Sequence, residues 1–189
     1  MTGIGSNGLE YLLHGAALES EQEKRLRALG FYEAPASKGH HLAYRGGLVL
    51  HSYNVARRLV TLTPALGVAW SRPESPYLVG MLHDLVKCKC YRLNPDGRTY
   101  SYVQPEWPGH GFASAMIATV ELDIRLNADE AAAIIHHMGA FGLQSRALDE
   151  FDAALARWPA QIIATHTADW AAARIDEAGD WSGEREVRP

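Results

Sequence analysis

Histidine and aspartate side chains recur along this chain, and most of the histidines stand inside apolar segments. Imidazole and carboxylate groups together are natural ligands for a divalent transition metal. Because an unpaired buried charge is costly, such groups in a helical core are either paired or bound to a metal. The candidate positions lie on separate segments: His51, the adjacent His83 and Asp84, His110, the adjacent His136 and His137, and Asp169. Their recurrence predicts a metal centre to which several helices contribute.

The segment Tyr77–Lys87 carries the most informative of these residues. It is apolar nearly all round and predicts a buried helix, with His83 and Asp84 in its middle. Lys87 follows Asp84 by three residues, so the two side chains are expected on one helical face. Simpler interpretations stay open: a buried His83–Asp84 hydrogen bond without a metal, and a Lys87 that is a solvated helix end or an ion-pair partner of Asp84.

Further helices must position these residues. Ser20 and Glu23 form a capping-box pattern that starts a helix over Glu21–Leu29. Gly46 and Gly47 allow a tight turn into a helix that contains His51 in its first turns and ends at Pro64. Other helices are expected around Leu9 to Gly15 and over Phe112–Leu122, Ala128–Met138 after an Asn127 cap, Leu148–Trp158 and Ala160–Ala178.

The segment Tyr91–Val103 differs from the rest of the chain. Aromatic and β-branched residues flank Asn-Pro-Asp-Gly, a pattern that predicts a β-hairpin. The hairpin follows the Lys87 helix directly, so we expect it to overhang the site. Tyr91, Tyr100 and Tyr102 could stack a nucleobase, or they could simply pair across the strands.

The predicted fold class is therefore all-α, a helical bundle with one small inserted β-hairpin. We expect N-terminal helices within residues 1–37 that pack on the core, a main domain over residues 38–178, and a charged, disordered tail over residues 179–189. At 189 residues, with 47% hydrophobic and 21% charged residues, the chain has the composition of a soluble globular protein. Cys88 and Cys90 are too close in sequence to form a disulfide framework, and their role stays open.

Charge and hydropathy exclude several kinds of partner. The formal net charge is −4, so no basic field recruits long nucleic acid or an anionic membrane. No apolar run approaches the roughly 18 residues of a membrane span. The first residues lack the pattern of a signal peptide, so we expect a cytoplasmic protein.

The order and local context of these residues resemble the HD superfamily of metal-dependent phosphohydrolases. The similarity rests on His51 after Gly46-Gly47-Leu48-Val49-Leu50, on Leu82-His83-Asp84-Leu85-Val86-Lys87, and on Thr167-Ala168-Asp169. Gly109-His110 and His136-His137-Met138-Gly139 resemble the extra histidine motifs of members that hold a second metal. The segment His40-His41-Leu42-Ala43-Tyr44 resembles the entry to the first motif in the branch that includes 3′→5′ exoribonucleases. The likeness covers residues 40–175, most of the chain.

The resemblance implies an HD-domain fold, a divalent metal cofactor and a hydrolase activity. It implies that His51, His83, Asp84 and Asp169 hold a first metal, and that His110 and His136, rather than His137, hold a second one bridged by Asp84. The metal would activate water and polarise the phosphoryl group, and Lys87 would stabilise phosphate charge. Catalytic roles are expected for His83, Asp84 and Lys87, and substrate contacts for Lys87, His41, His137 and Tyr91. The metal count, one or two, and the choice among Mn, Fe, Co, Ni, Zn and Mg stay open.

We therefore expect a metal-dependent phosphohydrolase that cleaves a phosphate ester or anhydride of a nucleotide or a nucleotide-like small molecule. The exoribonuclease relatives have an acidic residue where this chain has Leu50, and they carry an added nucleic-acid-binding domain for which this chain has no room. A phosphodiesterase or nuclease using the same site is the first alternative. A catalytically silent nucleotide-binding regulatory module is the second, and di-iron oxygenase chemistry is a more distant one. The oligomeric state stays open.

Overall fold

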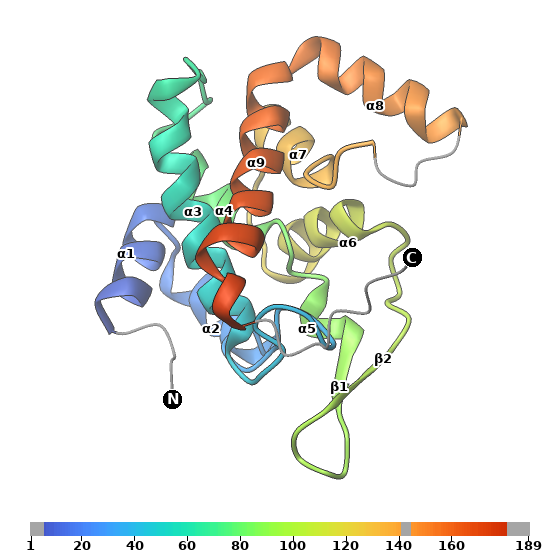
Figure 1. Ribbon diagram of the computed structural model, residues 1–189. Coiled ribbons are helices and arrows are strands. Elements are labelled where there is room, and N and C mark those ends of the chain that lie inside the picture. Colours follow the sequence, from blue (N-terminus) through green and yellow to red (C-terminus); the bar gives the residue numbers. More distant parts are fainter. Residues whose placement is uncertain (1–5, 141–144, 181–189) are drawn as a thin grey trace.

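The computed structural model describes residues 6–140 and 145–180, which are mostly helical with one two-stranded antiparallel sheet (Figure 1). The all-α prediction with an inserted hairpin is confirmed. The expected tail from residue 181 onward and part of the expected loop after Ala140 lie outside the described residues. The elements are α1 (Ser6–Ala16), α2 (Ser20–Ala28), α3 (Gly47–Ala65), α4 (Ser75–Leu82), α5 (Lys87–Cys90), β1 (Tyr91–Leu93), β2 (Tyr100–Tyr102), α6 (His110–Met116), α7 (Ala128–Ile135), α8 (Ser145–Arg157) and α9 (Pro159–Ala171).

Helices α3, α4 and α9 form the centre of the molecule, and α1 covers α4 from one side (Figure 1). Helix α4 is apolar and buried along nearly its whole length. It can approach α3 closely because Gly80 has no side chain: a Cβ there would lie 2.5 Å from Ala56 Cα. This close approach brings the segment that follows α4 against the first turns of α3, where His51 lies.

A second close approach joins α6 to α7. A Cβ at Gly111 would lie 2.3 Å from the carbonyl oxygen of Ile135, at the end of α7. Glycine is therefore required at the second residue of α6. The contact places the start of α6 beside the end of α7, and α7 packs in turn against α9.

Helix α4 is shorter than the sequence predicts. It ends at Leu82, so His83 and Asp84 lie in a turn before α5 rather than in the middle of a helix. The Gly80 carbonyl contacts His83 Nδ1 at 2.9 Å, and the next backbone bonds, from Lys87 to Asp84 and from Cys88 to Leu85, span three residues. A histidine side chain thus takes over a helical acceptor, and the chain tightens.

Other boundaries differ by smaller amounts. The capping box of α2 lies one residue earlier than expected, between Glu19 and Gln22. Helix α7 ends at Ile135 instead of Met138, and its Asn127 cap is confirmed. Helix α9 passes into a π-helical turn, Ala172–Asp176, where a continuous α-helix was expected.

The hairpin pairs Tyr91 with Tyr102 and Leu93 with Tyr100, and it projects from the helical body after α5 (Figure 1). Cys88 and Cys90 are free thiols beside it. No helix among the described residues has both the length and the apolar character needed to cross a membrane.

Candidate metal centre

The candidate ligands converge from two kinds of position. His51 lies inside α3 and Asp169 inside α9, each anchored by a long helix. The other candidates lie at helix ends: His83 and Asp84 follow α4, His110 begins α6, and His136 and His137 follow α7. Because these residues lie at the ends of helices, their side chains can meet at one point without the helices having to pack side by side.

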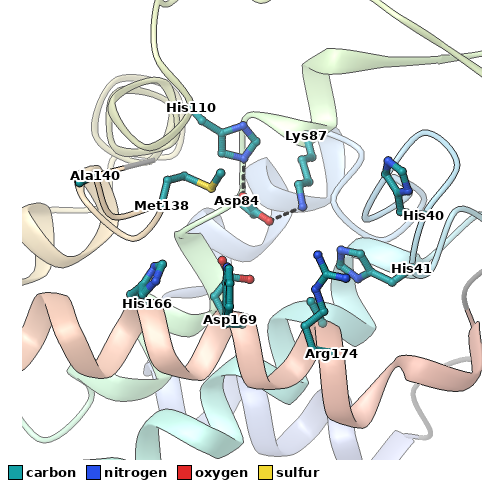
Figure 2. A pocket seen from close by; sticks show the side chains of 12 residues that line it. His40, His41, Asp84, Lys87, His110, Met138, Ala140, His166, Asp169 and Arg174 are labelled. Carbon is teal, nitrogen blue, oxygen red and sulfur yellow. Dashed lines mark hydrogen bonds and ion pairs between the residues drawn. The ribbon is translucent and has the colours of Figure 1, made fainter. Parts of the chain in front are cut away.

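Asp84 is the centre of the group, and its carboxylate is nearly inaccessible to solvent (Figure 2). Its Oδ1 lies 2.5 Å from His110 Nε2 and 3.5 Å from His137 Nε2. Its Oδ2 lies 3.5 Å from His51 Nε2, 3.4 Å from His83 Nε2 and 2.5 Å from Lys87 Nζ. The two oxygens therefore face two different pairs of histidines, the arrangement of a bridging carboxylate.

Asp169 joins the first of these two pairs, His51 and His83. Its Oδ1 lies 3.1 Å from His51 Nε2 and 3.9 Å from His83 Nε2. The two imidazole nitrogens His51 Nε2 and His83 Nε2 are themselves only 3.3 Å apart. Two ring nitrogens and two carboxylates in such proximity require a shared positive charge between them, either a proton or a metal ion.

Two of the rings, those of His83 and His137, are held at Nδ1 by backbone carbonyl oxygens, so that Nε2 faces the centre. His83 Nδ1 lies 2.9 Å from the Gly80 carbonyl oxygen, and His137 Nδ1 lies 2.7 Å from that of Ile134, so each Nδ1 is the donor. Among the residues that the structure describes, the buried His137 Nε2 has no hydrogen-bond partner. An orphaned imidazole nitrogen aimed at a carboxylate fits a metal ligand.

The pKa values of the candidate ligands also indicate a site for positive charge. Burial lowers the pKa of His51, but hydrogen bonds to Asp169 and Glu177 outweigh it and raise the pKa to about 9. Burial raises the pKa of Asp84, but Lys87, His83 and His110 outweigh it and hold the pKa well below its usual range. Burial lowers the pKa of His83 and outweighs the opposing effect of Asp84, and His137 lowers this pKa further. The surroundings thus favour positive charge beside two ionised carboxylates, which a proton supplies here and a metal ion can supply instead.

The structure brings His137, not the expected His136, to this centre. His136 lies on the outer side of the turn, where its ring packs on Phe151 at 5.6 Å between centroids. Because α7 ends at Ile135, the chain turns so that His137 faces inward and is fully buried. A fully buried His137 also does not line the cavity, so it is not placed to contact a substrate as expected.

A cavity of about 730 Å³ opens beside the centre (Figure 2). Lys87 and His41 line it, as predicted for substrate contacts, together with Asp84, His110 and Asp169. Tyr91 is not among the lining residues; its ring packs on Tyr102 across the hairpin, at 6.4 Å between centroids. The hairpin tyrosines thus fit the simpler of the two interpretations that the sequence left open.

Other residues line the cavity as well. Helix α9 presents His166 and Trp170 to it, and the π-helical turn that follows α9 presents Arg174. Met138 and Ala140 line it from the segment after α7. Residues three or four apart on a helix share one face, so Asp169 indicates that His166 lies on the same side of the helix.

Glu177 is the main residue that the sequence did not reveal. Its carboxylate is 1% exposed and contacts His51 Nδ1 at 3.0 Å, on the ring edge opposite Asp169. It also contacts His41 Nδ1 and the Asn54 side-chain amide. Glu177 holds the His51 ring from behind.

Comparisons with known proteins add no relative to this picture. No family model, no curated protein and no solved structure matches the chain. Its function must therefore be argued from the geometry of this centre.

Proposed function

We propose that this protein is a metal-dependent phosphohydrolase of the HD type. The observation that carries the proposal is Asp84, whose two carboxylate oxygens face two separate sets of imidazole nitrogens at the floor of a cavity. One set is His51 and His83 with Asp169, and the other is His110 and His137. Imidazole and carboxylate donors fit one or two first-row divalent ions.

In this proposal the metal ligands, Lys87 and His41 have different roles. A divalent ion held here would lower the pKa of a bound water and polarise a phosphoryl oxygen. Lys87 is 12% exposed, contacts Asp84 and reaches the cavity, so its ammonium can meet a phosphate oxygen. His41 lines the same cavity from the loop before α3 and can contact the substrate phosphate.

A nucleotide is the substrate class that suits the cavity best. A volume of about 730 Å³ falls within the range of small-molecule sites. The exposed Trp170 ring offers a stacking surface for a base, and Arg174, one turn later, adds a second cation to Lys87. The stacking surface in this proposal is thus Trp170 of α9 rather than the hairpin tyrosines.

The experiment combines metal analysis with a substrate panel. Protein purified without chelators is analysed for metal content and assayed on nucleoside mono- and triphosphates, a cyclic nucleotide and a dinucleotide. Asp84→Asn should lose most of its metal and at least about 100-fold in turnover, because bridging and charge stabilisation are worth several kcal/mol. His136→Ala is the matched control, since this histidine faces away from the centre. Unchanged turnover in Asp84→Asn would refute the proposal.

The same panel separates the alternatives. Cleavage of the cyclic nucleotide or the dinucleotide without turnover of the other substrates would favour a phosphodiesterase or nuclease. Stoichiometric metal and tight nucleotide binding without turnover of any substrate would favour a silent regulatory module.

A further inference from the structure

Glu177 is a buried carboxylate whose neighbours are all hydrogen-bond donors. Its Oε1 lies 3.0 Å from His51 Nδ1 and 3.0 Å from Asn54 Nδ2, and its Oε2 contacts His41 Nδ1. A carboxylate that is 1% exposed keeps its charge only when such donors surround it. Glu177 therefore ties the cavity residue His41 to the candidate ligand His51.

The contact with His51 decides which ring nitrogen faces the centre. A carboxylate can only accept, so His51 Nδ1 must be the donor. The opposite nitrogen, Nε2, then points at Asp169 Oδ1 and Asp84 Oδ2, 3.1 Å and 3.5 Å away. For His83 and His137 a backbone carbonyl oxygen contacts Nδ1, whereas for His51 a carboxylate does so.

The π-helical turn Ala172–Asp176 brings Glu177 to this position. Glu177 N–H donates to the Ala172 carbonyl at 3.0 Å, a bond that spans five residues. In a regular α-helix, a residue eight positions after Asp169 would point roughly 80° away from it. The π turn acts as one inserted residue and brings the two directions to within roughly 20°. Asp169 and Glu177 can therefore reach opposite edges of the same imidazole.

We propose that Glu177 is a positioning residue that orients His51 and increases its strength as a metal ligand, without binding the metal itself. This inference rests on the proposed metal centre. Carboxylates behind ligating histidines fix the ring orientation and raise ligand basicity, and their loss typically weakens metal binding by 10–100-fold.

The test measures metal affinity without any substrate. Metal-free wild type and Glu177→Gln are titrated with Zn²⁺ in competition with a chromophoric chelator. Glu177→Gln should bind about 10–100-fold more weakly at an unchanged number of sites, because a neutral amide oxygen accepts from His51 more weakly than a carboxylate does and leaves the imidazole a weaker ligand. The visible spectrum of the Co²⁺-loaded variant should also shift, since His51 is then a weaker ligand.

Asp176→Asn is the matched control. It removes a carboxylate from the adjacent residue, but Asp176 pairs with Arg58, at 2.6 Å, and not with the histidines. Its Zn²⁺ affinity should equal that of wild type. Asn54→Ala is a second variant, which leaves the carboxylate in place but removes one donor that orients it. It should weaken Zn²⁺ by a smaller factor, and it carries the test if Glu177→Gln does not fold.

Distinct outcomes overturn the inference. Glu177→Gln with the Zn²⁺ affinity of Asp176→Asn would show that Glu177 does not act through His51. Loss of one whole metal equivalent, with the remaining affinity unchanged, would make Glu177 a ligand itself, since His41, His51 and Glu177 also lie within ligating reach of one another. A wild type that binds no metal would overturn both this inference and the proposed function. A wild type that binds metal but hydrolyses no phosphate would overturn only the function.

Discussion

Two buried carboxylates in this molecule, Glu130 and Asp84, have different surroundings. Glu130, in α7, is fully buried and is contacted by four protein donors. They are Arg72 Nε at 2.7 Å, Arg72 Nη2 at 2.8 Å, Ser75 Oγ at 2.7 Å and the Asn127 backbone N–H at 2.7 Å. The Glu130 cluster is thus complete within the chain.

Asp84 is equally buried, but its neighbours are mixed. Lys87 donates to it at 2.5 Å, whereas His83 Nε2 presents a lone pair to it, because the Nδ1 proton is donated to Gly80 and burial lowers the pKa of the ring. Among the described residues, the buried His137 Nε2 also has no hydrogen-bond partner. The difference teaches how to separate structural from functional burial: a structural carboxylate is surrounded by donors alone, whereas a site for a cation also brings lone pairs of further ligands next to the carboxylate. Removal of the metal and substitution of Glu130 test that distinction directly.

Removing the metal should give the largest effect. With metal present at about 1,000 times its Kd, chelation should lower the free energy of unfolding by about 4 kcal/mol, because the ion binds only the folded chain. Denaturation in urea with and without chelator measures it. Asp84→Asn should show no response to chelator, and an equal response in both proteins would contradict the assignment of the centre.

Breaking the Glu130 cluster should come next. Glu130→Gln removes the charge facing Arg72, and we expect a loss of about 2–3 kcal/mol in the free energy of unfolding, since charge-assisted hydrogen bonds at a buried carboxylate are lost while the partly exposed Arg72 is screened by solvent. Metal content of the folded variant should stay that of wild type. Glu23→Gln is the control, because Glu23 pairs with Arg27 on the exposed face of α2 and should cost less than about 1 kcal/mol. Loss of metal in Glu130→Gln would mean that the two clusters are not independent.

Separating α3 from α4 should have an intermediate effect on the stability of the fold and on metal binding. A Cβ at Gly80 meets Ala56 backbone, so Gly80→Ala should destabilise the fold by about 2 kcal/mol. It should also weaken metal binding, because His51 lies in α3 and His83 directly follows α4. Gly39→Ala, which meets no atom within 4 Å, is the control. Wild-type metal affinity in Gly80→Ala would show that the helix spacing does not set the distance between the ligands.

Changing the stacking surface should have the smallest effect and spare both clusters. Trp170→Ala should raise KM for a nucleotide by about tenfold, as loss of one base–aromatic contact costs about 1–3 kcal/mol. Trp170→Phe should retain most of the affinity, and ribose 5-phosphate should show no difference among the three proteins. Steady-state kinetics measures this, and equal rises in KM for both substrates would exclude base stacking.

Much of the architecture follows from the sequence. Apolar periodicity and turn residues predict the helices and the hairpin, because each of these signals is local. The order of His51, His83, Asp84, His110 and Asp169 also anticipates which side chains the structure brings together. These positions stand out because polar residues interrupt apolar segments.

The failures lie where a helix ends or changes register. Whether His136 or His137 faces inward depends on α7 ending at Ile135, which the apolar pattern does not mark. His83 takes over a helical acceptor, so the chain leaves the helix before Asp84. Glu177 is hidden for the same reason, because a regular helix would turn it away from Asp169. Such features depend on tertiary contacts and have no pattern of their own.

The π-helical turn after α9 has a consequence for comparing sequences. A relative that kept a regular helix here would carry the equivalent carboxylate seven positions after its aspartate instead of eight. A search that fixes this spacing would leave Glu177 unmatched, and an alignment would need a one-residue gap between Ala172 and Asp176 to recover it. The gap would mark the position where an α-helical turn became a π-helical turn, while the carboxylate beside the His51 imidazole kept its place in the structure.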